Sequence, residues 1–154
     1  TIQAAILQVK FQAFIDYELE NVNQIAQLYT ARLKGIVKTP VIPEGYYSSW
    51  AQYTIQFDNK EQRDTIQEKV REQGIPTMIY YPKPMHRQKA FCDLECPKSD
   101  LKVTNCLCDR VLSLPIHPYL QESDIIKICG EITRQLTREE IRGEVGSNNP
   151  RMPA

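Results

Sequence analysis

The sequence lacks a net charge, a long apolar run and a secretion signal. Its 154 residues carry 19 lysines and arginines against 19 aspartates and glutamates, a balance that argues against nucleic acid or an anionic membrane as a partner. No apolar run approaches the roughly 20 residues needed to span a bilayer. No basic segment followed by an apolar one occurs at the start of the chain. We therefore expect a cytoplasmic protein.

Glycine is also scarce, and cysteine is present in an odd number. Only six glycines occur, and they form no glycine-rich phosphate loop. The cysteine spacing resembles a zinc site, but structural zinc sites prefer two ligand pairs at knuckle-like spacing. Reduced thiols are the favoured interpretation, because cytosolic proteins rarely carry structural disulfides. A small cysteine-based metal module stays open as an alternative. The five cysteines are Cys92, Cys96, Cys106, Cys108 and Cys129.

Two helical stripes of apolar residues occupy the first 35 residues. The first stripe is Ile2, Ile6, Val9 and Ala13, and the second is Ile15, Leu19, Val22, Ala26, Tyr29 and Leu33. The phase slips between Ala13 and Ile15, so one long helix must bend there or contact two different bodies. No residue precedes Thr1 to form a cap. We expect a truncated chain whose first stripe faces a body absent from it.

Three short β-prone runs follow this helix. Residues 51–57 alternate between apolar and polar, residues 77–81 alternate after a helix stop at Gly74, and residues 111–114 are followed by Pro115. Asp58 and Glu61 match a capping box for a helix up to about Gln73. These patterns predict an α+β fold: a long opening helix, then a mainly antiparallel three-stranded sheet with helices on one face. The predicted units are an interdomain helix (1–35), a small domain (36–137) and a disordered tail (138–154).

The stretch from Gly74 to Phe91 holds the best candidate for a ligand-binding loop. Its predicted strand ends in Tyr80 and Tyr81. The two prolines of Pro82-Lys83-Pro84 then hold the backbone extended between this strand and His86. Binding groups concentrate on loops that a rigid scaffold positions.

The sequence of this stretch, GIPTMIYYPKPMHRQ, closely resembles a loop in the small domain of the DegT/DnrJ/StrS-type sugar aminotransferases. These are pyridoxal-phosphate enzymes that aminate keto groups on nucleotide-linked sugars. The resemblance extends to residues 2–10, 48–55 and 111–120, in the family's order. It is closest to enzymes that act on UDP-linked 3-keto uronic-acid sugars. It implies the C-terminal domain of a fold-type I aminotransferase.

The resemblance also implies which residues contact substrate, often in the partner subunit's active site. Tyr80 and Tyr81 match the strand-end pair that approaches the sugar, where the family often has His-Tyr, so Tyr80 is a departure. His86 and Gln88 match the family's His-x-Gln, and Ser48 lies in the motif for uronic-acid sugars. His117, between Pro115 and Pro118, also lies in a family-like motif and is expected to hold backbone geometry.

A transaminase needs a lysine that forms a Schiff base with its cofactor. Ser99-Asp100-Leu101-Lys102 has a Ser-x-x-Lys spacing, but it follows the substrate loop and lacks a glycine-rich sequel. We therefore expect no catalytic, cofactor-binding or metal-binding residue in this chain, and an inactive fragment. The resemblance implies that the full-length protein is a homodimer that uses pyridoxal phosphate, a nucleotide sugar and an amino-acid amino donor. The alternative is a non-catalytic, stand-alone module that binds sugar nucleotides or another protein.

Overall fold

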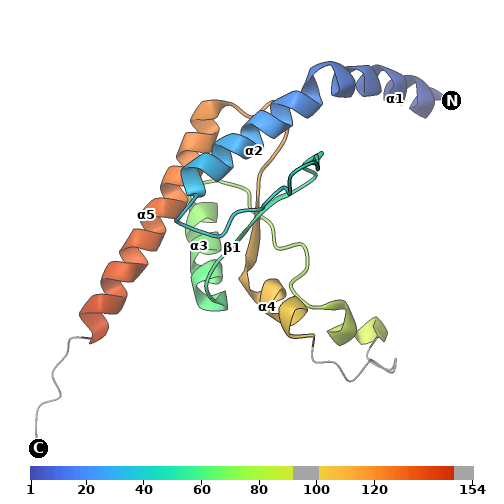
Figure 1. The fold of residues 1–154 in the computed structure, drawn as a ribbon. Helices are drawn as coiled ribbons and strands as arrows, with labels where there is room; N and C mark the ends of the chain where they lie inside the picture. Colours follow the sequence, from blue (N-terminus) through green and yellow to red (C-terminus); the bar gives the residue numbers. More distant parts are fainter. Residues whose placement is uncertain (92–100, 148–154) are drawn as a thin grey trace, which may run out of the picture.

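A computed structural model of the chain describes residues 1–91 and 101–147, and side chains up to residue 138. Figure 1 shows a long bent helix, a small sheet and a long final helix that leads away from it. The elements in chain order are α1 (Ile2–Ala13), the π-helix η1 (Phe14–Glu18), α2 (Leu19–Leu33), β1 (Tyr53–Gln56), α3 (Lys60–Glu72), the 3₁₀ turns η2 (Met85–Arg87) and η3 (Lys89–Phe91), α4 (Lys102–Arg110), β2 (Val111–Leu114) and α5 (Glu122–Ser147).

The opening helix bends where the apolar pattern slips in phase. The π-helix η1 separates α1 from α2 at that point, and the two α-helices diverge in direction (Figure 1). A π turn holds more residues than an α turn, so it rotates the apolar face that follows it. The second stripe is buried from Val22 onward, but Ile15 is 57% exposed. Thr1 does cap the helix, because its hydroxyl accepts a hydrogen bond from Ala4 N at 3.3 Å; the expectation of an uncapped start is wrong.

Within the described residues the sheet contains two strands, not the predicted three. β1 and β2 are antiparallel, with Tyr53 opposite Leu114 and Ile55 opposite Leu112. The predicted strand at residues 77–81 is reduced to a single bridge in which Met78 exchanges both backbone hydrogen bonds with Ser113, at 3.0 and 2.9 Å. Prolines at 76, 82 and 84 flank this segment, and proline has no N–H to extend a ladder. The coarser prediction, a mixed helical fold with a small antiparallel sheet, is confirmed.

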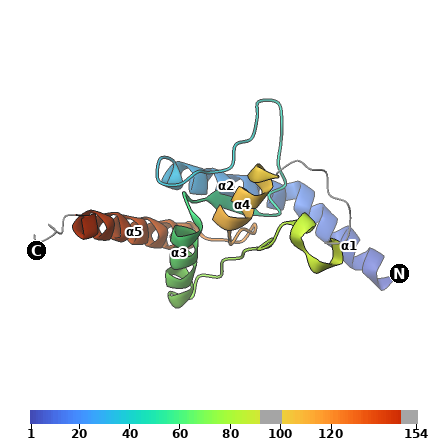
Figure 2. The same ribbon diagram turned by 90° about the horizontal axis from the view of Figure 1, so that it is seen from below.

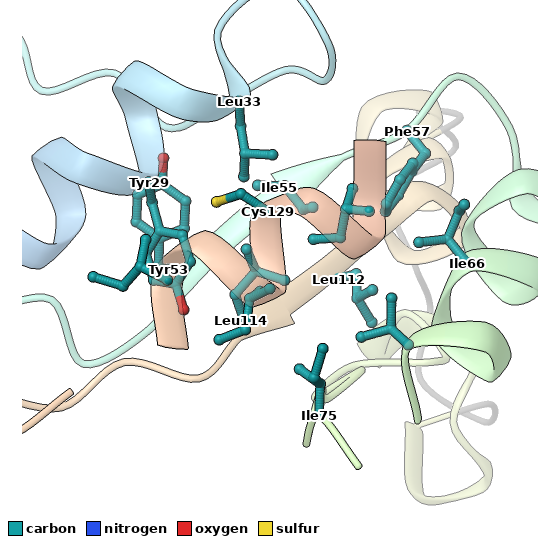
Figure 3. Packing of buried hydrophobic residues seen from close by; sticks show 14 of the residues in the cluster. Tyr29, Leu33, Tyr53, Ile55, Phe57, Ile66, Ile75, Leu112, Leu114 and Cys129 are labelled. Carbon is teal, nitrogen blue, oxygen red and sulfur yellow. The ribbon is translucent and has the colours of Figure 1, made fainter. Parts of the chain in front are cut away.

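One face of the sheet packs against helices and forms the core. Figure 3 shows Tyr53, Ile55 and Leu112 pointing into a cluster with side chains from the surrounding helices. Because side chains of a strand alternate between faces, the apolar alternation of 53–57 places one whole side of β1 in this core. The fully buried members include Tyr29, Leu33, Tyr53, Ile55, Ile66, Val70, Leu112, Ile125 and Ile132.

Two helix boundaries differ from the sequence prediction. The cap of α3 is Asn59, whose side chain accepts from Gln62 N at 2.8 Å; the proposed Asp58–Glu61 box is one residue early. Gln62 instead accepts from Asp58 N at 3.2 Å. α5 continues to Ser147, beyond residue 138 where the tail was predicted to begin. The rest of that predicted tail, 148–154, lies outside the described residues, and the three domain bounds stay predictions. No helix in the described ranges is long and apolar enough to cross a membrane.

Candidate functional site

A pocket of about 280 Å³ lies beside the Met78–Ser113 bridge, at the end of the small sheet. Residues of the segment 76–80 line this pocket, and so do the first residues of the loop 115–120 that follows β2, here called the His117 loop. The prolines at 76 and 115 end the pairing on either side, so both segments leave the sheet and open a space between them. We call this the Tyr80 pocket; it is lined by Ala51, Gln52, Pro76, Thr77, Met78, Tyr80, Ser113, Leu114, Pro115, Ile116 and His117.

Polar groups of the Tyr80 pocket differ in how well they are paired. The Ser113 hydroxyl shares a hydrogen bond of 2.8 Å with that of Thr54. The Thr77 hydroxyl is buried and has no hydrogen-bond partner among the described residues. Native proteins rarely leave such a group unpaired, so this position favours a bound water or ligand. With the half-exposed Tyr80 phenol, the pocket offers hydroxyl and imidazole groups to a polar ligand.

The other residues predicted for the substrate loop lie beyond the Tyr80 pocket along the chain. Tyr81 is 65% exposed, and the segment Pro82–Pro84, in which Pro84 is buried, leads from it to η2. His86 lies half-buried in η2, and Gln88 donates to the Lys83 carbonyl at 3.4 Å, which closes the loop on itself. Tyr80 is therefore the one predicted site residue that lines this pocket within the described part of the chain.

Ser48 lies in a second, larger pocket of about 740 Å³ between α2 and the segment that follows it. That segment extends well away from the other elements (Figure 2). The Ser48 hydroxyl accepts from Trp50 N at 3.2 Å, so it holds a local turn. Trp50 has a φ of 49°, which is uncommon for a residue other than glycine. The structure does not bring Ser48 to the Tyr80 pocket.

Asn23 fixes this turn, and sequence reasoning missed it. Its Oδ1 accepts from Trp50 Nε1 at 2.9 Å, and its Nδ2 donates to the Ser48 carbonyl at 3.2 Å. The Trp50 ring also packs on Tyr53, with centroids 5.5 Å apart. An asparagine on the polar side of a helix gives no sequence signal for such a role; the nearest signal was the chain's single tryptophan.

The cysteines do not form a metal site within the part of the chain that the structure describes. Cys106, Cys108 and Cys129 are free thiols, and the other two cysteines, Cys92 and Cys96, lie outside the described residues. Cys129 lies in the core near Tyr29 (Figure 3), and burial raises the pKa of its thiol to about 11. A buried thiol of this kind is unreactive.

The profile of the DegT/DnrJ/EryC1/StrS aminotransferase family matches residues 1–133. This chain belongs to the DegT/DnrJ/EryC1/StrS aminotransferase family. It is 37% identical over 134 residues to the UDP-2-acetamido-2-deoxy-3-oxo-D-glucuronate aminotransferase of Pseudomonas aeruginosa, a match that covers 86% of this chain and 35% of that protein.

Two further matches are also aminotransferases. The chain is 35% identical over 139 residues to a UDP-N-acetyl-3-dehydro-α-D-glucosamine 3-aminotransferase of Acidithiobacillus ferrooxidans, covering 88% of the chain and 35% of that protein. A family member from Brucella abortus matches in structure with a TM-score of 0.74 and 41% identity, over 80% of this chain and 32% of its own. The chain therefore spans about a third of the length of the relatives it matches.

The family implies pyridoxal phosphate as its cofactor, but the Tyr80 pocket does not supply what that group needs. The aldehyde of the cofactor requires a lysine, and the described lining of the Tyr80 pocket contains none. Lys10, Lys60 and Lys69 are paired with Glu18, Asp64 and Glu72. The residues of this pocket do not fit the cofactor, and their hydroxyl and imidazole groups suit a polar ligand instead.

Proposed function

We propose that this chain is the substrate-binding small domain of a pyridoxal-phosphate-dependent aminotransferase that transfers an amino group to the keto carbon of a nucleotide-linked sugar. The observation that carries the proposal is the family match over residues 1–133, with relatives of more than 30% identity that are aminotransferases of UDP-linked 3-keto sugars. The cofactor, held by another part of the full-length protein, supplies the chemistry of amino transfer. This chain binds and orients the sugar nucleotide.

The proposed contacts come from the Tyr80 pocket and the loop beyond it. Tyr80 and Tyr81 offer phenol groups that donate and accept hydrogen bonds with sugar hydroxyls. His86 and Gln88 follow on the same loop, where an imidazole and an amide can donate to a phosphate or a hydroxyl. Ser48 stays in the proposal as a contact from the second pocket, provided that its turn opens. The exposure of Tyr80 and Tyr81, at 51% and 65%, supports an assignment to binding instead of core packing.

The proposal includes the setting of the full-length protein. We infer a cytoplasmic homodimer in which the substrate loop of one subunit reaches the active site of its partner. An amino acid serves as amino donor. The exposure of Tyr80, Tyr81 and Met85 supports this arrangement, because a loop that serves a partner's site presents side chains away from its own core.

The test replaces two loop side chains in the full-length dimer. Tyr81→Phe removes one hydroxyl, and a lost hydrogen bond of about 0.5–1.5 kcal/mol lowers kcat/KM for the nucleotide sugar roughly threefold to tenfold. His86→Ala removes a contact that is worth about 1.5–3 kcal/mol if it faces a phosphate. Tyr46→Phe tests the Ser48 pocket separately, because Tyr46 is 75% exposed and lines that pocket and not the Tyr80 pocket. Unchanged kcat/KM in both loop variants would remove these residues from the site.

The second candidate is a non-catalytic module that binds sugar nucleotides or another protein. The favouring observation is that no lysine lines the Tyr80 pocket among the described residues. The full-length protein separates the two candidates. Turnover of a UDP-linked 3-keto sugar with an amino donor supports the aminotransferase, whereas binding without turnover supports the module.

A further inference from the structure

Three side chains of the opening helix hold the His117 loop. The Tyr29 hydroxyl donates to the Pro115 carbonyl at 2.9 Å, and Asn21 Nδ2 donates to the Pro118 carbonyl at 3.5 Å. The Tyr119 hydroxyl donates to the Glu18 carboxylate. Glu18 is only 3% exposed, although glutamate is rarely buried unless it is paired. The contacts run from one end of the loop to the other, so the loop is tied to the helix along its length.

Glu18 also joins this loop to α1. Lys10, near the end of α1, forms an ion pair with the same carboxylate. The Lys10 ammonium lies 3.5 Å from the Tyr119 hydroxyl and 5.4 Å from the centroid of its ring. The hydrogen bond from Lys10 lowers the pKa of Glu18, and the bond to Glu18 raises the pKa of Tyr119 to about 12. Three elements therefore meet at one carboxylate.

The π-helix explains how Glu18 reaches this position. Glu18 follows Lys10 by eight positions in the sequence. In an unbroken α-helix the side chains of these two residues would be about 80° apart around the axis. The extra residue of the π turn rotates the following side chains by about 100°, the turn contributed by one residue. Glu18 is the last residue of η1, so it is the first place where this rotation is complete. The π turn that shifts the apolar stripe therefore also sets the direction of the Glu18 side chain.

Tyr119 links Glu18 to a residue that lines the Tyr80 pocket. Tyr119 N donates to His117 Nδ1 at 3.3 Å, so one residue of the loop bonds both to Glu18 and to His117. His117, Ile116 and Pro115 line the same pocket as Tyr80. A shift of Tyr119 would therefore move the His117 imidazole and the wall it belongs to.

We propose that Glu18 is a positioning residue that fixes the His117 wall of the Tyr80 pocket to the opening helix. Through the pair with Lys10, the geometry of the pocket follows the position of α1. The role of this geometry in binding a nucleotide sugar rests on the proposed function. The attachment of the loop to Glu18 does not.

The first measurement uses the fact that the chain has only two histidines, His86 and His117. Proton NMR of the imidazole signals in this chain reports on the pocket wall through His117, with His86 in η2 as an internal reference. Tyr119→Phe removes a single oxygen and keeps the ring, so it leaves the core intact. We expect the His117 signal to shift or broaden in Tyr119→Phe and in Glu18→Ala, while the His86 signal stays in place. Glu18→Gln, which keeps an acceptor for Tyr119, restores most of the wild-type His117 signal.

The matched control is Glu20→Ala, which removes the same charge two residues later from an exposed position. It should leave both histidine signals unchanged. A folded Glu18→Ala or Tyr119→Phe chain with a wild-type His117 signal overturns the proposal. If Glu18→Ala does not fold, Tyr119→Phe decides alone.

The second measurement separates this proposal from the proposed function. In the full-length protein, Tyr119→Phe should raise KM for the nucleotide sugar roughly threefold to tenfold with little change in kcat, because the loop positions a binding wall. An equal KM in wild type and Tyr119→Phe overturns the link between Glu18 and binding. If the wild-type protein shows no transamination, the proposed function fails, and the His117 signal still decides whether Glu18 positions the loop.

Discussion

Arg63 is a buried cation in α3. Its guanidinium is 3% exposed and donates to the carbonyls of Cys108 and Val111, at 3.2 and 3.1 Å. These carbonyls lie at the C-terminal end of α4, where the last turn of a helix leaves acceptors without intrahelical partners. Asp64 completes the arrangement with an ion pair at 2.6 Å. Arg63 therefore connects α3 to the junction of α4 and β2.

Arg63→Met should destabilise the chain by about 2–3 kcal/mol. The substitution keeps most of the apolar stem but leaves two carbonyls without their charge-assisted donor, and such bonds contribute about 1.5–3 kcal/mol. Urea unfolding followed by Trp50 fluorescence measures the change. Arg71→Met, at an exposed position on the same helix, is the control and should change the free energy of unfolding by less than about 0.5 kcal/mol. Equal midpoints in the two variants would contradict a structural role for Arg63.

At the scale of elements, the bridge at Met78 is what remains of a third strand. Met78→Pro removes the N–H that donates to the Ser113 carbonyl at 3.0 Å, on the side that faces β2. We expect a loss of about 1 kcal/mol or more, because proline is tolerated in a sheet only where its missing N–H faces solvent. Thermal unfolding measures the loss, with Met78→Leu as the control that keeps the bond. A melting temperature for Met78→Pro equal to that of Met78→Leu would mean that the bridge contributes nothing to stability.

The same element shows what sequence patterns can and cannot predict. Period-two alternation predicted β1, which buries one face, and a short β-prone run ended by Pro115 predicted β2. The phase slip at Ala13 predicted the bend at η1. Residues 77–81 also alternate, but their pairing depends on prolines at both ends and on a partner at Ser113 that is distant in sequence. Arg63, Glu18 and Asn23 were missed for the same reason: each is defined by a contact with a residue far along the chain. For the candidate site, the sequence led to Tyr80, but it gave no sign that Ser48 lies in a different pocket.

α1 presents an uncovered apolar face. Ile2, Ile6 and Val9 are 81%, 64% and 75% exposed, and α1 has no buried residue. Contiguous apolar surfaces of this kind usually find a partner by association. We expect this chain to self-associate or to fray before about Ala13, as light scattering and amide exchange along α1 would show. Ile6→Glu should reduce association, and Val103→Glu, on the similarly exposed face of α4, should not. A monodisperse monomer with strong amide protection from residue 2 onward contradicts both outcomes.

At the scale of the whole molecule, the chain holds one side of a proposed active site. It matches a family of aminotransferases while spanning about a third of its relatives. Its described surface offers hydroxyls, amides and an imidazole around the Tyr80 pocket, and Lys10, Lys60 and Lys69 pair with neighbouring carboxylates. Binding groups and the reactive centre are thus expected on different segments of the full-length protein, and only their assembly completes the site.

This division of roles predicts that the chain alone forms no stable covalent adduct with pyridoxal phosphate. A Schiff base persists on one lysine when its surroundings lower the pKa of the amine and hold the phosphate, and the hydrogen bond from Lys10 to Glu18 instead raises the pKa of Lys10. Mixing the purified chain with the cofactor should give only the weak, reversible visible absorption of exposed amines. Borohydride reduction and peptide mapping should then find label spread over many lysines. A stable aldimine band that borohydride fixes on a single lysine would place a cofactor site within this chain, and the division between binding and reactive segments would be wrong.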